Sequence, residues 1–212
     1  MSDSLMLYTD SNFISPYAMS VFVALTEKGL AFEMTPVDLG RGEQRQTAYG
    51  ALSLTGKVPA LVHNGYGLAE STAIIEYVNE AFAGPALLPQ DPQQRARARQ
   101  IQAWVRSDLM PLRQERSSDI LFDRPAQALP PLSADARQAA DKLIRVAEQL
   151  LPAAGKSLFG AWSIADLDLA FMLNRLVSGG DAVPQRLTDY VHHQWARSSV
   201  QRWVGFNERQ RA

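Results

Sequence analysis

Two serines in the sequence stand where a helix is expected to begin. Ser15 precedes Pro16, and Ser71 follows Glu70 after an apolar run. Serine caps the free amides of a first helical turn, and proline suits the first helical position. Ser15 therefore either caps its helix or donates a hydrogen bond to a ligand. Ser71 either caps its helix or, with nearby amides, binds a carboxylate at the positive end of the helix dipole.

A third candidate segment is Lys57-Val58-Pro59, which leads directly into an apolar run. A proline at this place is either cis and next to a ligand site, or trans at the first residue of an edge strand. In the cis geometry, Val58 can offer its backbone N–H and C=O to an extended peptide, as a neighbouring strand would. This alternative predicts a small peptide ligand.

The composition limits the reactions and partners that the chain can have. It has 212 residues, no cysteine and a net charge of -1. Any thiol that reacts must be supplied by a ligand. The near-neutral charge gives no overall attraction to nucleic acid or anionic lipid. The three histidines, His63, His192 and His193, lack zinc-binding spacing, and no apolar run reaches about 18 residues. We expect no metal, no nucleic-acid partner, no membrane insertion and a cytoplasmic location.

Strand-like and helix-like patterns alternate over the first 84 residues. Asn64-Gly65 between two apolar runs is a strong hairpin signal. A βαβ unit followed by a ββα unit is the thioredoxin-like arrangement. The expected elements are a strand over Leu5–Thr9, a helix from Ser15-Pro16 to Gly29, a strand over Phe32–Asp38, a mainly loop segment over 40–56, strands over Val58–His63 and Tyr66–Leu68, and a helix from Ser71 to Gly84.

Beyond Leu87-Leu88-Pro89 the patterns are helical. Ser163 and Asp166 occupy the two positions of a capping box, and Pro111 is expected to kink the helix that contains it. The fold class is therefore α/β plus all-α, with a thioredoxin-like domain over 1–84 and a helical-bundle domain over 90–212. The three long helical patterns cover Ile101–Leu112, Ala136–Leu151 and Ile164–Val177.

Together, these segments resemble the cytosolic glutathione transferases over essentially the whole chain. The resemblance rests on Ser15-Pro16, Gly56-Lys57-Val58-Pro59-Ala60-Leu61, Glu70-Ser71 and Ser163-Ile164-Ala165-Asp166. Three further runs look like the bacterial YfcF-like branch: Ser15-Pro16-Tyr17, residues 97–104 and residues 106–111.

The resemblance implies that the chain binds glutathione as a co-substrate in its first domain. In that family a Glu-Ser pair holds the γ-glutamyl carboxylate, which here corresponds to Glu70 and Ser71. The residue before the cis-proline pairs with the cysteinyl backbone, which here assigns Val58 next to Pro59. The basic residue before it, Lys57, can reach the glycyl carboxylate.

The resemblance also implies a residue that activates the glutathione thiol. By the Ser-Pro match this residue is Ser15, and we expect it to be catalytic. Tyr8, Ser11, Tyr17 and a backbone amide remain alternatives. Tyr8 also fits the role of a buried strand residue, because tyrosine favours strands.

The second substrate is expected to be a small electrophile or hydroperoxide. Its pocket is expected between the domains, walled by the loop before Ser15 and by the first long helix. Asn12, Phe13, Trp104 and Asp108 are candidates to line it, and each also fits a core or interface position. The resemblance further implies a homodimer.

Three functions follow from these expectations. The first is a glutathione S-transferase that activates the thiol for conjugation, with glutathione-dependent peroxidase activity as an addition. The alternative is a transferase-like scaffold or interaction module without catalysis. A zeta-type isomerase is disfavoured, because the chain reads Phe13-Ile14-Ser15-Pro16 where a Ser-Ser-Cys segment is expected.

Overall fold

The computed structural model describes residues 4–123, 127–153 and 155–211. The chain forms two compact units. The first contains residues 1–87 and 199–212, and the second contains residues 88–198.

A four-stranded mixed sheet forms the centre of the first unit, in the order β2-β1-β3-β4. Strand β1 (Leu5–Asp10) runs parallel to β2 (Glu33–Val37) and antiparallel to β3 (Ala60–His63), which pairs with β4 (Tyr66–Ala69). Leu5 and Leu7 are buried because alternate side chains of a strand face the same side. The predicted βαβ-ββα order, and with it the thioredoxin-like part of the fold class, is confirmed.

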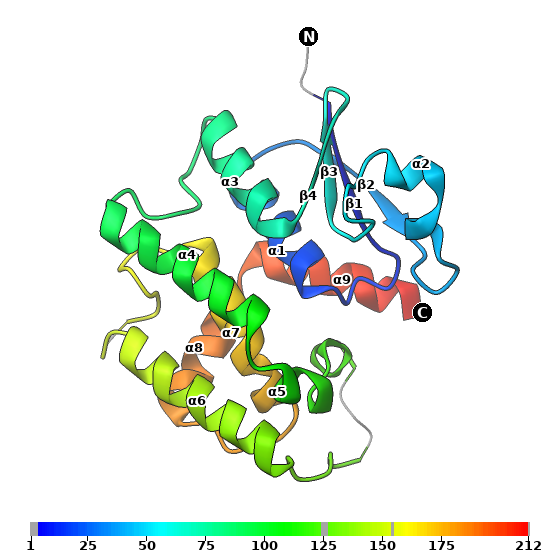
Figure 1. Ribbon diagram of the computed structural model, residues 1–212. Helices are drawn as coiled ribbons and strands as arrows, with labels where there is room; N and C mark the ends of the chain where they lie inside the picture. Colours follow the sequence, from blue (N-terminus) through cyan, green and yellow to red (C-terminus); the bar gives the residue numbers. More distant parts are fainter. Residues whose placement is uncertain (1–3, 124–126, 154, 212) are drawn as a thin grey trace. The chain divides into compact units, whose positions relative to one another are not determined.

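Helices lie on both sides of this sheet. Helices α1 (Pro16–Glu27) and α3 (Ser71–Ala81) pack against each other, and Figure 1 shows α3 and α2 (Thr47–Gly50) on opposite sides of the strands. A short 3-10 helix, η1 (Glu43–Arg45), precedes α2 within the segment expected to be mainly loop. The hairpin turn has positive φ at Asn64 and Gly65, as a type I′ turn requires.

The C-terminal helix α9 (Ser198–Arg211) also belongs to the first unit, apart from its first residue. Trp203 is fully buried, and its indole N–H donates to the carbonyl of Phe13 over 2.9 Å. The Trp203 ring lies 5.4 Å from the rings of both Phe13 and Phe22. This aromatic cluster fixes the loop before α1 to α9.

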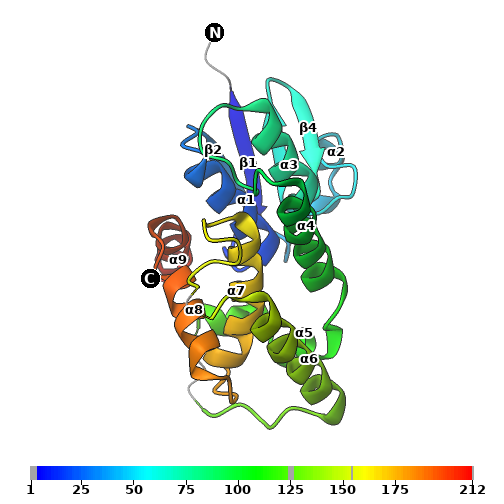
Figure 2. The same cartoon turned by 90° about the vertical axis from the view of Figure 1, so that its left-hand side faces the viewer.

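Helices make up the regular structure of the second unit over its described residues, apart from an isolated β-bridge between Phe159 and Ala161. Helix α7 (Ile164–Ser178) is buried on all sides, as its continuously apolar pattern predicts. Figure 2 shows it between α4 (Pro92–Ser107) and α8 (Gln185–Trp195). The expected capping box of Ser163 and Asp166 is present. The helices are α4 (Pro92–Ser107), α5 (Met110–Glu115), η2 (Ser118–Leu121), α6 (Ala134–Leu150), α7 (Ile164–Ser178) and α8 (Gln185–Trp195).

The predicted kink at Pro111 is wrong, because the chain forms two separate helices there. Helix α4 ends at Ser107, and Leu109 takes a left-handed backbone conformation with φ of 64°. Pro111 then lies in the first turn of α5, where its missing N–H costs no hydrogen bond. The three long patterns do not include α8 and α9, which have 11 and 14 residues.

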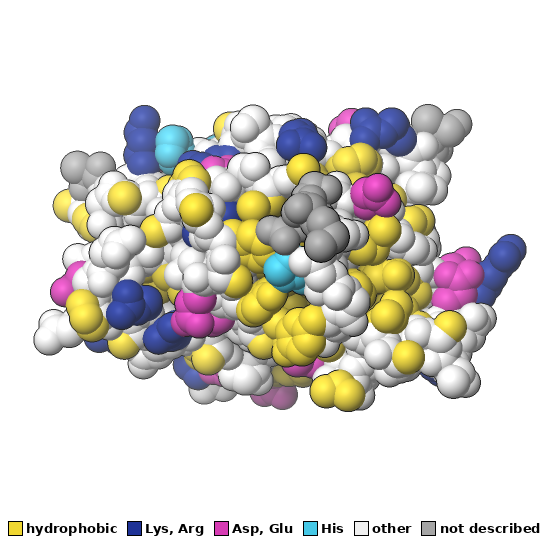
Figure 3. Space-filling model, turned by 90° about the horizontal axis from the view of Figure 1, so that it is seen from above, with side chains coloured by type: hydrophobic (Ala, Val, Ile, Leu, Met, Phe, Trp, Pro, Cys, Tyr) yellow, Lys and Arg dark blue, Asp and Glu magenta, His cyan; other side chains and the backbone are white. Residues whose placement is uncertain are grey.

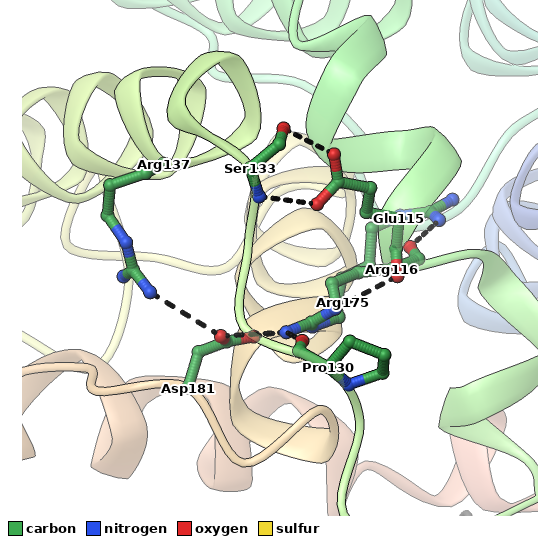
Figure 4. Close-up of polar contacts among 7 residues, drawn as sticks. All are labelled: Glu115, Arg116, Pro130, Ser133, Arg137, Arg175 and Asp181. Carbon is green, nitrogen blue, oxygen red and sulfur yellow. Dashed lines mark hydrogen bonds and ion pairs between the residues drawn. The ribbon is translucent and has the colours of Figure 1, made fainter.

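A buried arginine cluster joins Arg116 at the end of α5 and Pro130 to the end of α7 and to Asp181 (Figure 4). Arg116 donates to both carboxylate oxygens of Asp181, over 2.7 and 3.0 Å, and to the carbonyl of Pro130 over 2.9 Å. Arg175 donates to the carbonyl of Arg116 over 2.6 Å. A Cβ at Gly179 would lie 2.7 Å from the Arg116 side chain, so this close packing requires glycine.

Candidate functional site

Strand register brings the three candidate segments of the first unit together. Tyr8 of β1 is paired with Ala60 of β3, and Ala60 is paired with Ala69 of β4. Pro59 precedes Ala60 and Glu70 follows Ala69, so these two segments leave the sheet side by side. The carboxyl end of β1, which leads to the loop before α1, lies at the same edge.

Ser15 is the N-cap of α1. Its Oγ accepts a hydrogen bond from the backbone N–H of Ala18 over 3.3 Å, and Pro16 occupies the first helical position. A hydroxyl that accepts one bond still carries a proton that it can donate. Capping and donation to a ligand are therefore compatible roles for Ser15.

Asp10 is part of this edge, and the sequence reasoning missed it. Its carboxylate is 3% exposed and accepts from the N–H groups of Ile14, over 2.7 Å, and Ser15, over 3.2 Å. Burial raises the pKa of Asp10, and the bonds from these two amides partly oppose that shift. An aspartate at the end of an apolar strand, just before a Ser-Pro helix start, was the available signal.

The Val58–Pro59 peptide bond is cis. Lys57 is exposed, Val58 is half-buried and Pro59 is buried. The carbonyl of Lys57 accepts hydrogen bonds from the Tyr49 hydroxyl, over 2.9 Å, and from the Ser53 hydroxyl, over 3.0 Å. Of the two geometries that the sequence leaves open, the structure has the one that suits pairing with a peptide.

Glu70 and Ser71 connect β4 to α3. Glu70 is exposed and has a φ of 71°, and its carbonyl accepts from the N–H of Ile74 over 2.9 Å. Ser71 is the first residue of α3 and is 5% exposed. The start of α3 therefore lies next to the cis-prolyl segment, where the helix dipole favours an anion.

Two competitors for thiol activation have defined positions in the sheet region. The ring of Tyr8 packs edge-on against Tyr49, with 5.9 Å between ring centroids. The backbone N–H of Ser11 donates to the carbonyl of Val37. The amides of Ile14 and Ser15 point to Asp10, so these two amides already have an acceptor.

The four candidates for the second-substrate pocket fall in different units. Asn12 and Phe13 belong to the first unit. Phe13 is 6% exposed and stacks on Phe206, and the carbonyl of Asn12 accepts from the Asn207 side chain over 2.7 Å. Their lining role stays a prediction.

Trp104 and Asp108 belong to the second unit, on and just beyond α4. The indole N–H of Trp104 donates to Asp108 over 2.9 Å, and Lys142 also donates to this carboxylate. The bond from Lys142 is the largest cause that holds the pKa of Asp108 below its usual range, followed by the bond from the N–H of Leu109. Trp104 lines a groove of about 260 Å³ together with Arg97, Gln100, Ile101, Lys142, Val146 and Leu150.

In residues 4–123, 127–153 and 155–211, no three His, Cys, Asp or Glu side chains are grouped to hold a metal ion. Over the same part of the chain, no helix is both long and apolar enough to cross a bilayer.

The protein combines a thioredoxin-like sheet, with a cis-proline at one edge, and a helical unit. Comparisons with known proteins identify its family. Residues 14–81 match the glutathione S-transferase N-terminal domain, and residues 91–209 match the glutathione S-transferase C-terminal domain. The chain belongs to the glutathione S-transferase family.

Individual relatives agree with this placement. A glutathione transferase homologue from Burkholderia, solved with bound glutathione, is 43% identical, with 97% of this chain and 99% of that chain covered and a TM-score of 0.81. Maleylacetoacetate isomerase from Methylobacterium extorquens, solved with malonate and glutathione, is 29% identical, with 95% and 97% covered and a TM-score of 0.73.

Among curated proteins, maleylacetoacetate isomerase from Pseudomonas aeruginosa is 48% identical over 109 residues, which is 50% of each chain. Glutathione S-transferase F9 from Arabidopsis thaliana is 43% identical over 96 residues, or 44% of this chain and 42% of the other. The chain thus spans about half the length of the curated relatives that it matches.

Proposed function

We propose that this protein is a glutathione transferase that lowers the pKa of the glutathione thiol and presents the thiolate to a small electrophile. The same thiolate would reduce hydroperoxides. The observation that carries the proposal is the meeting of Ser15, the cis Val58–Pro59 bond and Glu70-Ser71 at one sheet edge. Glutathione bound to the Burkholderia relative supports it.

Each part of glutathione has a proposed partner at this edge. Glu70 and Ser71 bind the γ-glutamyl carboxylate at the start of α3, where the helix dipole favours a negative charge. The backbone of Val58, before Pro59, pairs with the cysteinyl residue, and Lys57 attracts the glycyl carboxylate. Their exposed or edge positions are compatible with these contacts.

Ser15 is the proposed thiol-activating residue. A thiol with a pKa of about 8.5 needs roughly 2 kcal/mol of stabilisation to be half ionised at pH 7. A hydrogen bond to a charged group contributes about 1.5–3 kcal/mol, which covers this requirement. The amides of Ile14 and Ser15 are bound to the Asp10 carboxylate, so the Ser15 hydroxyl carries more of the stabilisation than these amides can.

The test measures the thiol pKa of bound glutathione from the ultraviolet absorbance of the thiolate as a function of pH. For Ser15→Ala we expect glutathione to bind and its thiol pKa to rise by about 1–2 units. Ser133→Ala is a matched control, because the Ser133 Oγ also accepts from an amide three residues on, over 3.3 Å. An unchanged thiol pKa in Ser15→Ala would move the role to Tyr8, Ser11, Tyr17 or a backbone amide.

The alternative functions are separated by simple assays. If the wild-type protein does not bind glutathione in calorimetry, the scaffold function replaces the transferase. The relatives named maleylacetoacetate isomerase favour a test of isomerase activity as a second candidate. Turnover of maleylacetoacetate with glutathione returned unchanged would establish that candidate.

We also propose a homodimer. Leu54, in the loop before Pro59, is 98% exposed, and Tyr66 on β4 is 56% exposed. Figure 3 shows hydrophobic side chains reaching the surface among charged ones on one face. In sedimentation experiments we expect the wild type to be a dimer and Leu54→Glu to shift toward monomer. Leu39→Glu, at another exposed leucine, is the control, and a dimer that survives both changes contradicts this role of Leu54.

Three finer assignments are proposals of the same kind. The Ser15-Pro16-Tyr17 segment supports membership of the YfcF-like branch, and the family supports a cytoplasmic location. We propose sequence domains over 1–84 and 90–212, in line with the matched ranges 14–81 and 91–209. The compact units differ from these domains in grouping residues 199–212 with the first.

A further inference from the structure

Two buried hydroxyls converge on one carbonyl next to the proposed glutathione site. The Tyr49 hydroxyl donates to the carbonyl of Lys57 over 2.9 Å, and the Ser53 hydroxyl donates to the same atom over 3.0 Å. Tyr49 is 7% exposed and Ser53 is 2% exposed. A carbonyl oxygen has two lone pairs, so these two donors use its full accepting capacity.

Fixing this carbonyl also fixes the direction of a donor on the next residue. The carbonyl of Lys57 and the N–H of Val58 belong to one planar peptide group. The cis bond of this segment is the following one, Val58–Pro59, so in the Lys57–Val58 peptide the C=O and N–H point in opposite directions. With the carbonyl directed toward Tyr49 and Ser53, the N–H of Val58 is directed away from them.

The tyrosine that supplies one of these donors is itself firmly held. Its ring belongs to a hydrophobic cluster with Val37 and Ala60, against which Tyr8 and Val58 also pack. Burial raises the pKa of Tyr49 to about 12, so the hydroxyl keeps its proton throughout the neutral range.

The loop that carries the serine is held from the other side. A Cβ at Gly67 of β4 would lie 2.7 Å from the carbonyl oxygen of Leu52, so the loop approaches the strand more closely than any side chain would allow. The N–H of Ser53 donates to the carbonyl of Tyr49 over 3.0 Å, which ties the two hydroxyl-bearing residues together. Both hydroxyls are therefore placed by packing that is independent of the carbonyl they bind.

We infer that Tyr49 and Ser53 are positioning residues for glutathione, because they aim the backbone N–H of Val58 at the cysteinyl part of the ligand. The inference rests on the proposed function and adds two residues to it, neither of which contacts the ligand. It predicts that either hydroxyl alone largely keeps the peptide in place. Loss of both frees the peptide to rotate.

The test compares glutathione affinity, by calorimetry, for Tyr49→Phe, Ser53→Ala and the double variant. We expect each single change to weaken binding by about 3-fold, as for one neutral hydrogen bond, and the double change to weaken it by more than the product of the two. Tyr77→Phe, which removes the hydroxyl bonded to His63 at the far end of β3, is the matched control and should bind as the wild type does. Ser53→Thr keeps the hydroxyl that Ser53→Ala removes, and it should bind glutathione as tightly as the wild type does.

A second readout separates positioning from a general loss of structure. The thiol pKa of bound glutathione should stay at its wild-type value in all these variants, because Ser15 is unchanged. In NMR spectra, the backbone amide resonance of Val58 should shift when glutathione binds to the wild type, and it should shift less in the double variant. Each single variant is tested by itself, so a double variant that fails to fold leaves the expected 3-fold losses and the Thr rescue as the deciding results.

These experiments distinguish a failure of the positioning role from a failure of the proposed function. If the wild-type protein does not bind glutathione, the proposed function fails. If the wild type binds, and Tyr49→Phe and Ser53→Ala bind equally well, the positioning role is refuted while the transferase stands. A weakened affinity that Ser53→Thr does not restore also refutes the role of the hydroxyl.

Discussion

Replacing Asp166 with alanine should strongly destabilise the helical unit. The Asp166 side chain is fully buried at the start of α7. Its carboxylate accepts from the N–H of Leu158 over 2.7 Å, the N–H of Ser163 over 2.8 Å and the hydroxyl of Tyr190 over 3.0 Å. One side chain thus joins the chain before α7, the first residues of α7 and helix α8.

The magnitude follows from what alanine leaves without an acceptor. The Tyr190 hydroxyl keeps a bond to the backbone carbonyl of residue 166 over 3.1 Å. The donors left without this acceptor are the amides of Leu158 and Ser163 and the Ser163 hydroxyl, which donates to the carboxylate over 3.1 Å. Each stranded buried donor costs about 1–3 kcal/mol. Burial raises the pKa of Asp166, so removing this carboxylate also relieves a desolvation cost. We expect a net loss of about 2–4 kcal/mol in the free energy of unfolding.

The assay is urea unfolding at neutral pH, followed by tryptophan fluorescence. Asp166→Asn keeps one acceptor oxygen and should lose about half as much free energy as the alanine variant. Asp141→Ala, at an exposed position of α6, is the control and should change stability by less than about 0.5 kcal/mol. A loss below about 1 kcal/mol for Asp166→Ala would refute the idea that these two amides depend on this carboxylate.

Two further changes test packing and charge. Gly67→Ala would place a Cβ 2.7 Å from the carbonyl of Leu52, so we expect a loss of about 1–3 kcal/mol in urea unfolding, whereas Gly50→Ala, with no atom within 4 Å, should be near neutral. For Asp108→Asn the sign follows from the lowered pKa of this carboxyl, which Lys142 causes first. The native state then holds fewer protons than the unfolded chain, so this stabilisation is present above pH 3.8 and is lost as pH falls through the lower native pKa. The free energy of unfolding of the wild type should fall on acidification. That of Asp108→Asn should fall by up to about 1 kcal/mol less. Equal losses in the two proteins would contradict a contribution of the ion pair to stability.

Short-range signals were sufficient for many elements of the fold. Asn64-Gly65 predicts a tight hairpin because both residues tolerate positive φ, and the turn has that conformation. Ser163 and Asp166 lie three residues apart and form their capping box within one turn. The prediction of a kink at Pro111 is wrong because a proline suits both a kink and a new helix start, and the left-handed Leu109 decides for a new helix.

The candidate site was only partly readable from the sequence. Local motifs identify Ser15, Val58-Pro59 and Glu70-Ser71 as candidates. No local pattern predicts that these segments lie at the same edge of the sheet. Their meeting depends on the register of β1, β3 and β4, which hydrogen bonds between distant residues establish. No local pattern singles out the hydroxyls of Tyr49 and Ser53, because only the folded chain directs them to one carbonyl.

The sequence by itself determined the βαβ-ββα order of the first unit, the capping box of α7, the hairpin turn and the absence of a thiol of the chain's own. These features depend on residues a few positions apart, where backbone preference and side-chain hydrogen bonding act within one turn. Tertiary structure decided the cis geometry at Pro59, the burial of Asp10 and the packing of α9 within the first unit through Trp203. The physical reason is that these outcomes depend on packing between segments up to about 190 residues apart, and no local preference encodes such contacts.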